Sequence, residues 1–491
     1  MSNSRGTAPY PTSRPPKKVR QACDACHARK VRCDGRTPCL NCTQGTTSCT
    51  YTAVHRKTGP KGPRRPRPTT YPVRFSESPQ AASIHDTPLS GSTTDDRYQD
   101  GFCPSPSLPD EVITWALDGF FKHKHPITPI LHRRQIEQYC ASSQKSPDSY
   151  ALFASCCSVI SLSPGILPPV EDSSQNAQLV LPSTEFLIQE TLRARQSCDL
   201  AEEPSLTHIQ TSFFLFSTFF CLGKDNSAWF YIREAITMLQ TLRYHEEITY
   251  TNLTDPLLAT YARRMFWVLF ITERAYALQR HRPLTLRATL ELPVAEPHIS
   301  DAQVLPGFLD LISLFRHFDV DFIETWNSDA ASSSSDTSAS FLILQDYLKQ
   351  ALPSVLSYSE MQQADLLISR QWLKVMVWQL CVSRTALSST GTDDSMSLQY
   401  PVTIARDAVL VSQLLPTRAL EANGVGILEK IFDIGCSLAD LLALKAGSNA
   451  LSTMEVGPVD TLMEIVRILC TTLGGSYKHT NLLVQKTTDC I

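Results

Sequence analysis

The 491-residue sequence lacks the features of a membrane or exported protein. No uncharged apolar run reaches the roughly 18–20 residues that a transmembrane helix needs. The most apolar stretch, residues 213–222, is about half as long and predicts a buried helix. Residues 1–10 are polar and contain proline, unlike the apolar centre of a secretory signal peptide. We therefore expect a soluble protein of the cell interior without a membrane partner.

Sequence motifs of common enzyme active sites are missing as well. The chain has no Gly-x-x-x-x-Gly-Lys-Ser/Thr phosphate loop, no Gly-x-Ser-x-Gly nucleophile turn and no His-Glu-x-x-His zinc helix. Since nothing in the sequence points to catalysis, the protein is predicted not to be an enzyme.

Sustained alternation of Val, Ile and Thr with polar residues is scarce, so β-sheets are not expected. From Leu108 onward, apolar residues recur at the spacing of amphipathic helices. Asp110 is expected to cap the first helix, which places Val112, Ile113, Ala116, Leu117 and Phe120 on one face. Further helices are predicted at 229–239, 257–280, 341–351, 361–388, 403–421, 425–445 and 457–474. The body of the chain should therefore be all-α.

Charge is distributed unevenly along the chain. Residues 1–68 contain fifteen Lys and Arg residues but only two acidic ones, Asp24 and Asp34. The whole chain nevertheless has a net charge of −3, so the remainder is strongly acidic. This asymmetry predicts a small head that binds a polyanion, attached to a larger body with a different task.

Cysteine is concentrated in the basic head. Of 16 cysteines, ten are scattered and are expected to be small buried thiols, whereas six follow the pattern Cys-x2-Cys-x6-Cys-x5-Cys-x2-Cys-x6-Cys. Six thiolates are too many for one tetrahedral zinc ion and too few for two separate four-thiolate sites. Each of two ions would have four sulfur ligands if two of the six thiolates bridged the ions. An iron–sulfur cluster would normally use four cysteines and leave two unexplained.

These cysteines and the residues between them resemble the binuclear zinc cluster of fungal transcription factors. The resemblance covers residues 20–51, including the run Arg-Lys-Val-Arg-Cys-Asp at 29–34 and Pro38 before the fourth cysteine. It implies that Cys23, Cys26, Cys33 and Cys39 hold one zinc ion. It also implies that Cys39, Cys42, Cys49 and Cys23 hold a second one, so that Cys23 and Cys39 bridge the pair.

The physical chemistry of the head agrees with this expectation. About thirty residues with almost no large apolar side chains cannot form a hydrophobic core, so metal binding must supply the folding free energy. Six thiolates and two Zn²⁺ ions together carry a charge of −2, which leaves the head strongly positive. We therefore expect double-stranded DNA as its partner, with a steep dependence on salt.

A short helix after Cys26, carrying His27, Arg29, Lys30 and Arg32, is expected to enter the major groove. In the family that the head resembles, the lysine matching Lys30 reaches the bases of a CGG-type triplet. Lys30 is therefore the predicted base reader, because lysine and arginine pair with guanine O6 and N7. Arg29 is the second candidate, and Arg32 and Arg36 are expected on phosphates. His27 stands where the family commonly has arginine or lysine.

Basic segments flank the cysteines on both sides. Residues 15–20 end in Arg20, and residues 55–68 combine Lys and Arg with Gly and Pro. Such segments serve as nuclear-import signals or as phosphate-binding arms, and they are also typical of disordered linkers. Residues 69–108 contain no heptad run long enough for a coiled coil. A homodimer, if formed, would therefore lack an obvious zipper.

The helical body also resembles the middle homology region of the same regulators. Residues 263–274 and 282–283 contain a similar Arg-Arg-x-x-Trp…Arg…Arg-Pro order. Arg263, Arg264, Glu273 and Arg274 are candidates for a ligand-sensing set. Surface and buried ion pairs are the favoured alternative.

The predicted organisation follows from these patterns. It comprises a disordered basic tail (1–19), a zinc cluster (20–52), a disordered linker (53–107), a helical regulatory domain (108–326), a flexible Ser-rich loop (327–340) and a helical C-terminal part (341–491). The predicted function is regulation of RNA polymerase II transcription in the nucleus, through CGG-type sites and contacts with the transcription machinery. The resemblance implies control of a metabolic or biosynthetic pathway. The alternative is a helical ligand-binding or scaffold protein whose head binds nucleic acid without sequence preference.

Overall fold

A computed structural model describes eleven parts of the chain in residue detail. They are residues 22–52, 102–142, 145–163, 165–166, 179–295, 302–328, 335–383, 395, 397–445, 457–472 and 477–490. The chain divides into two compact units, Met1–Thr94 and Asp95–Ile491. We call the described residues of the first unit the head and those of the second unit the body.

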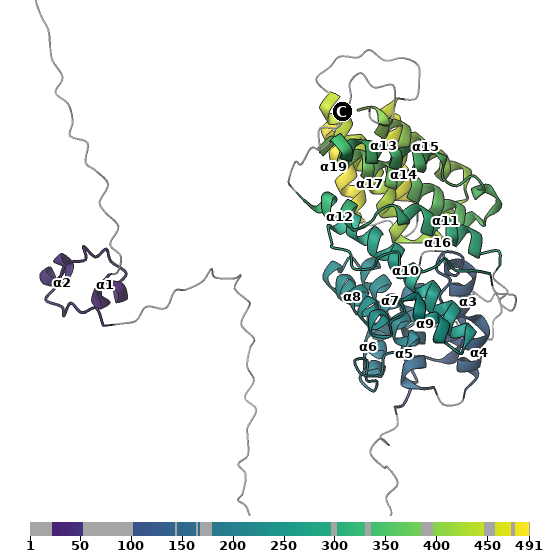
Figure 1. Ribbon diagram of the computed structural model, residues 1–491, viewed down its shortest axis with the longest axis horizontal. Helices are drawn as coiled ribbons and strands as arrows, with labels where there is room; N and C mark the ends of the chain where they lie inside the picture. The colour runs from purple at the N-terminus through teal and green to yellow at the C-terminus, as the bar shows by residue number, and fades with distance from the viewer. Residues whose placement is uncertain are drawn as a thin grey trace, which may run out of the picture. The chain divides into compact units, whose positions relative to one another are not determined.

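The head contains two single-turn helices, α1 (Asp24–Ala28) and α2 (Leu40–Gln44), joined and followed by irregular backbone (Figure 1). Its interior consists of five buried cysteines, with Ala22, Ala25, Cys49 and Tyr51 packed beside them. Because the buried residues are nearly all thiols, apolar burial alone cannot account for a stable fold of this size.

The body is helical throughout its described residues, as the sequence predicted. Its first group of helices comprises α3 (Asp110–Gly119), η1 (Phe120–Lys124), α4 (Arg133–Ala141), α5 (Pro147–Ser161), α6 (Thr184–Arg195), α7 (Leu206–Cys221), α8 (Asp225–Thr241), α9 (Glu247–Asn252) and α10 (Pro256–Arg280). Within this group α5 packs on α3, α6 and α7, and α7 pairs with α8. In Figure 1 the group occupies the lower half of the body.

The second group of helices occupies the upper half of the body in Figure 1. It comprises α11 (Leu305–Arg316), α12 (Val320–Asn327), α13 (Ser335–Gln350), η2 (Val355–Ser357), α14 (Glu360–Ser383), α15 (Tyr400–Leu414), α16 (Thr417–Asn423), α17 (Val425–Lys445), α18 (Pro458–Thr471) and α19 (Tyr477–Cys490). Helices α14 and α17 lie at its centre, since α15 packs on both and α18 and α19 pack on α17. No helix among the described residues is long and apolar enough to cross a bilayer.

The long helix α10 joins the two groups. Asp255 caps its N-terminus by accepting hydrogen bonds from the backbone N–H groups of Leu257 (2.9 Å) and Leu258 (3.2 Å). At its other end, Arg280 donates to Asp225 of α8 (3.0 Å) and to Glu429 of α17 (2.8 Å). This arginine therefore links the first group of helices to the second.

Three local predictions require correction. Asp110 is the first residue of α3 rather than its cap, because Pro109 occupies the cap position and the Asp110 carboxylate pairs with Lys145. The face predicted for this helix is nevertheless buried. Residues 403–421 form two helices, because Pro416 cannot continue the hydrogen-bond ladder of α15. The loop predicted over 327–340 does not extend to residue 340, since α13 already begins at Ser335, and residues 329–334 lie outside the described residues.

The body begins before Leu108. The Phe102 ring lies 5.2 Å from that of Tyr150, and the Arg193 guanidinium lies 4.8 Å from the Phe102 centroid. These contacts partly bury an aromatic residue that composition alone had assigned to the linker. The predicted tail (1–19) and the rest of the predicted linker (53–101) lie outside the described residues, so those boundaries stay predictions.

The Asp433 carboxyl group of α17 predicts a pH-dependent stability of the body. Burial raises its pKa to about 7, although Trp372 Nε1 donates to it at 2.9 Å. Its pKa in an unfolded chain is near 3.8, so the group lowers stability as the pH rises from about 4 to about 7. Asp433→Asn should therefore raise the free energy of unfolding, and with it the thermal midpoint, more at pH 8 than at pH 5. The difference in free energy between the two pH values should be at most about 3 kcal/mol.

Circular dichroism melts of both variants at the two pH values would test this expectation. Asp440→Asn is the matched control, because Asp440 lies on the same helix but is exposed and pairs with Lys486 at the surface. An equal shift of Asp433→Asn at both pH values would contradict the assignment.

Candidate metal centre and nucleic-acid interface

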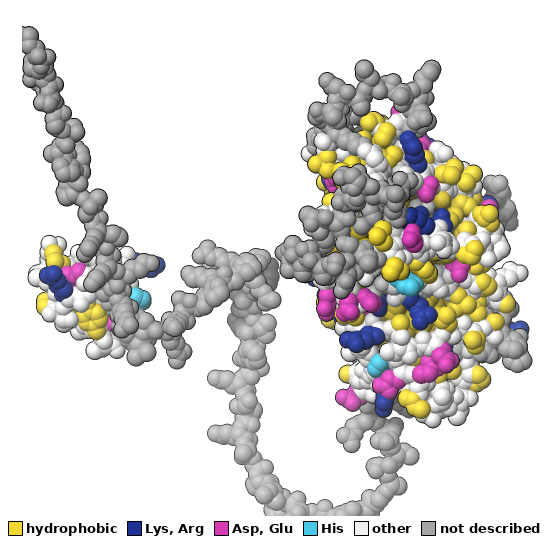
Figure 2. Space-filling view, turned by 45° about the horizontal axis from the view of Figure 1, so that its top comes forward, with side chains coloured by type: hydrophobic (Ala, Val, Ile, Leu, Met, Phe, Trp, Pro, Cys, Tyr) yellow, Lys and Arg dark blue, Asp and Glu magenta, His cyan; other side chains and the backbone are white. Residues whose placement is uncertain are grey.

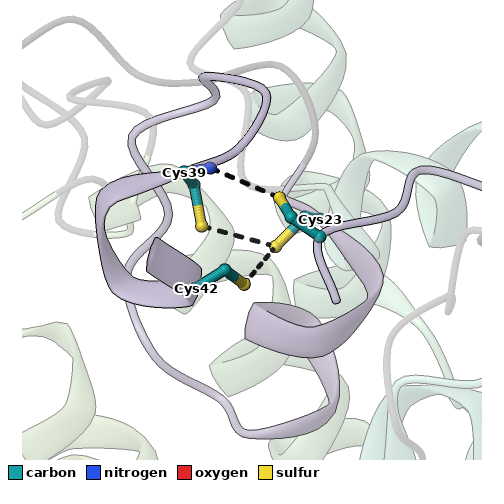
Figure 3. A group of neighbouring side chains, drawn as sticks. Cys23, Cys39 and Cys42 are labelled. Carbon is teal, nitrogen blue, oxygen red and sulfur yellow. Dashed lines mark hydrogen bonds between the residues drawn. The ribbon is translucent and has the colours of Figure 1, made fainter. Parts of the chain in front are cut away.

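The head brings the six cysteine sulfurs into one cluster. The Sγ atom of Cys23 lies 3.6 Å from those of Cys39 and Cys42, and Cys26 Sγ lies 3.5 Å from Cys39 Sγ. Figure 3 shows the side chains of Cys23, Cys39 and Cys42 pointing toward one another. Cys42 lies in α2, and the other two immediately precede α1 and α2. Zinc–sulfur bonds of about 2.3 Å in tetrahedral geometry place neighbouring sulfurs about 3.8 Å apart. The observed spacing fits that requirement closely.

The sulfurs form two groups of four. In each group the sulfur atoms all lie within 4.8 Å of one another, and the members are Cys23, Cys26, Cys33 and Cys39 in one and Cys23, Cys39, Cys42 and Cys49 in the other. Cys23 and Cys39 belong to both groups. Two tetrahedral ions that share these two thiolates would use every sulfur once or twice and leave none over. The donor set therefore fits a zinc pair.

Local structure explains why the two shared sulfurs are central. Cys23 is the residue before α1 and Cys39 is the residue before α2, so both half-motifs begin in the same way. Asp24 closes the ends of the head by accepting from Thr50 Oγ1 (2.9 Å) and from the backbone N–H of Thr52 (2.9 Å). These bonds hold the segment after Cys49 against α1.

The pKa values of the cysteine thiols are shifted in different directions. Interaction with the backbone N–H of Cys26 lowers the pKa of Cys23, and backbone N–H groups likewise lower that of Cys33. Burial and hydrogen bonds with neighbouring thiols raise the pKa of Cys26 to about 12. Six thiolates at these distances repel one another, so their joint ionisation needs bound cations.

Lys30 occupies an unusual position immediately after α1. Its φ is +54°, in the left-handed region that normally favours glycine. The backbone N–H of Lys30 donates to His27 O (3.2 Å), and that of Val31 donates to Cys26 O (3.1 Å), which is the Schellman arrangement of a helix end. The structure thus tolerates a strained lysine at a site where glycine would fit better.

The helix that was predicted to follow Cys26 instead contains this residue. It begins at Asp24 and ends at Ala28, so among the predicted DNA-binding residues only His27 is helical. Arg29 is its C-cap, Lys30 follows, and Arg32 lies on irregular backbone. The helix ends at Ala28 because the left-handed backbone at Lys30 and the hydrogen bonds of this helix end stop the helical ladder. The side chains of His27, Arg29, Lys30, Arg32 and Arg36 are all exposed, whereas Arg20 lies outside the described residues.

The four charged residues singled out in the body make separate contacts. Arg263 forms an ion pair with Glu247 (2.5 Å), and Glu273 accepts from Arg233 (2.9 Å). The Arg274 guanidinium donates to the carbonyl oxygens of Phe270 and Leu286 and lies 3.3 Å from the Phe270 ring centroid. Arg264 is buried. These contacts are those of structural ion pairs and buried hydrogen bonds, the alternative that the sequence favoured.

Sequence reasoning missed a mixed donor group in the body. Asp148 Oδ1 accepts from the Cys198 thiol (2.8 Å) and lies 2.9 Å from His208 Nε2. The three residues lie in the first turn of α5, just after α6 and in the first turn of α7. Spacings of 50 and 60 residues leave no local motif that a single sequence could reveal. The group is a polar link among three helices.

Comparisons with known proteins agree with the architecture. Residues 21–58 match the fungal Zn(2)-Cys(6) binuclear cluster domain, and residues 117–380 match the fungal specific transcription factor domain. The second match alone spans more than half of the chain.

Some of the similar proteins match most of the chain, and others match only the head. A maltose fermentation regulatory protein of Saccharomyces cerevisiae is 24% identical over 430 residues, which cover 86% of this chain and 84% of the relative. A probable sucrose utilization protein of Candida albicans is 27% identical over 447 residues, or 88% and 80% of the two chains. A C6 finger domain transcription factor of Aspergillus fumigatus is 44% identical over 55 residues, 11% and 13% of the two chains. The chain therefore belongs to the fungal specific transcription factors that carry an N-terminal Zn(2)-Cys(6) cluster.

Proposed function

We propose that the head, folded around two zinc ions, binds CGG-type triplets in double-stranded DNA through Lys30. The observation that carries this proposal is the exposed cationic run 29–32 beside two sulfur groups that share Cys23 and Cys39. Backbone hydrogen bonds to His27 and Cys26 fix the main chain at Lys30, and a fixed main chain favours the positioning that base reading requires.

The remaining basic residues have supporting roles in this proposal. Arg29 is the second base-reading candidate. The phosphates, or other parts of the DNA backbone, are contacted by Arg32, Arg36, Arg20 and His27. Phosphate contacts set position and affinity, while base contacts set sequence preference. The proposal therefore assigns specificity to very few side chains.

We also propose that the chain acts in the nucleus and controls genes of carbohydrate use through contacts with the transcription machinery. This part rests on relatives named for maltose fermentation and sucrose utilization. The body would then transmit the response, and a homodimer would place two heads on two triplets without a zipper.

Competition between DNA sequences tests the sequence preference. Labelled CGG-containing DNA should resist bulk competitor DNA by a ratio of roughly 10³ or more if binding is specific. Equal competition by both would instead favour a head that binds nucleic acid non-specifically. Selection of bound DNA from a random pool would report one triplet or two at fixed spacing.

Lys30→Gly isolates the base-reading role from folding. Because residue 30 has a positive φ, glycine should keep or improve the helix end while removing the amine. We expect binding to a CGG site to fall by about 10–100-fold, corresponding to 1–3 kcal/mol, with little change for a scrambled site. Arg36→Ala is the matched control and should weaken both DNAs alike. Equal loss on both DNAs in Lys30→Gly would refute base reading by Lys30.

A further inference from the structure

Two adjoining hollows lie in the body where its two groups of helices meet. Their volumes are about 190 Å³ and about 220 Å³. Side chains of α7 and α10 line them on one side, and residues 422–427, from the end of α16 and the start of α17, on the other. They share a wall formed by Ile127, Thr128, Phe216, Phe220, Thr272 and Asn423, so one ligand could extend through both.

Most of the lining is apolar and aromatic. Phe216 and Phe220 stand between the hollows, and Tyr276, Phe308 and Phe315 line the first hollow. The Phe216 and Phe220 rings stack at 5.9 Å, and both also contact Tyr276, at 5.7 and 6.1 Å. Such a wall suits the flat or branched apolar part of a small organic molecule.

Lys124 supplies the second hollow with an amine that can carry a positive charge. Its Nζ atom donates to the carbonyl oxygen of Ala422 (2.8 Å), and among the described residues no carboxylate forms an ion pair with it. Burial lowers the pKa of this lysine, since the cation loses water without gaining an anion. The residue lies in η1, a π-helix, and such turns often occur at functional sites.

The other charged groups that line the hollows compensate one another. Lys430 Nζ donates to Asp365 Oδ1 (3.1 Å) and to Ser369 Oγ (2.7 Å). Burial raises the pKa of the Cys221 thiol, so this neighbour of Lys124 stays neutral near pH 7. Among the described residues that line the hollows, Lys124 is therefore the lysine without an ion pair, and it adds a positive charge there when it is protonated.

Gly426 leaves open space in the lining that the two hollows share. It lies in the first turn of α17 and lines both hollows, and a Cβ atom added there would meet no heavy atom within 4 Å. Glycine in a helix costs roughly 1 kcal/mol relative to alanine, yet packing does not require it here. The open space at Gly426 is therefore a place where a larger side chain would enter the cavity.

We propose that this cavity binds a small organic anion, with its apolar part against Phe216 and Phe220 and its acidic group at Lys124. Occupancy would hold η1 and α7 of the first group of helices against α16 and α17 of the second. All residues of the proposed site belong to the body, so ligand binding there can be tested separately from DNA recognition by the head.

A matched pair of fluorescent probes tests the proposal on the full-length, zinc-loaded chain. Anilinonaphthalene sulfonate and phenyl-naphthylamine share one aromatic skeleton, and only the first carries an anionic group. Both should bind at one site per chain with a rise in fluorescence. The sulfonate should bind more tightly, because it gains the interaction with Lys124.

Three variants separate the contributions. Lys124→Met should weaken the sulfonate at least tenfold and leave the uncharged probe within about twofold. Gly426→Leu should weaken both probes at least tenfold by filling the cavity, and Gly426→Ala offers a milder version if leucine impairs folding. Lys122→Met removes an exposed lysine from the same π-helix and should change neither probe.

The measured affinities of the two probes test the site and the anion assignment separately. Absence of binding by both probes, or unchanged binding in both Gly426 variants, would overturn the site. Equal weakening of both probes by Lys124→Met would overturn the anion assignment. Specific DNA binding by these variants should equal that of the unaltered chain.

Discussion

Cys39→Ser is expected to abolish site-specific DNA binding and to remove both zinc ions from the head. Cys39 belongs to both sulfur groups, so its loss leaves neither ion with four thiolates. The head has no apolar core to compensate, since its buried residues are nearly all cysteines. Structural zinc sites supply on the order of 10 kcal/mol or more of apparent folding free energy. Affinity for a CGG site should therefore fall to the level of a scrambled site.

Elemental analysis and DNA binding of purified chains would measure this effect. The unaltered chain should contain about two zinc ions, a stoichiometry that follows from two four-sulfur groups with shared members. Cys103→Ser is the matched control, because Cys103 is exposed and belongs to the body. Two retained zinc ions in Cys39→Ser would contradict the bridging assignment. Intact specific binding after zinc chelation would contradict the whole account of the head.

Glu273→Ala is expected to destabilise the body by about 3–5 kcal/mol, the range for breaking a buried charge pair. The Glu273 side chain is buried and accepts four hydrogen bonds. Its donors are Arg233 Nη1 (2.9 Å), the backbone N–H and Oγ1 of Thr285 (3.0 and 2.7 Å) and the backbone N–H of Leu286 (3.0 Å). Removal leaves buried donors without an acceptor. The segment after α10 would lose its hydrogen bonds to Glu273, although Arg274 would still donate to the carbonyl oxygen of Leu286.

Urea denaturation followed by circular dichroism would report the loss as a lower midpoint. A loss of this size is a large share of a typical stability of 5–15 kcal/mol. Glu464→Ala is the matched control, because its ion pair with Arg467 lies at the surface. Such pairs contribute about 0–1 kcal/mol, so the control should shift the midpoint little. Similar shifts in both variants would show that the buried network is not special.

Specific DNA binding by the head should survive Glu273→Ala at temperatures where the body remains folded. Zinc ligation in the head shares no residue with the Glu273 network. Loss of zinc from this variant would therefore contradict the expectation that zinc binding by the head does not require the Glu273 network.

Local patterns predicted much of the body. The helix predicted at 257–280 is α10 (Pro256–Arg280), and the one at 425–445 has the bounds of α17. Long amphipathic periods and strong caps, such as Asp255, are visible in a single sequence. Boundaries at Asp110 and Pro416 were wrong because the choice of cap and the breaking effect of one proline depend on neighbouring geometry. The contacts of Phe102 were missed because they join residues far apart in the sequence.

Cysteine spacing by itself determined the kind of head this protein has. Ligand count and ligand chemistry are properties of the sequence, and a fold without an apolar core has little else to decide its form. Amphipathic periodicity likewise determined that the body is helical. The backbone conformation at Lys30, by contrast, belongs to a left-handed helix end that the sequence pattern did not reveal.

The cavity beside Lys124 was decided by tertiary structure alone. Its walls come from segments separated by up to about 300 positions, such as Lys124 and Ala422. Burial of a cation and the open space at Gly426 arise only when those segments pack. Periodicity and spacing describe the chain locally, whereas a binding site depends on which distant residues share a space.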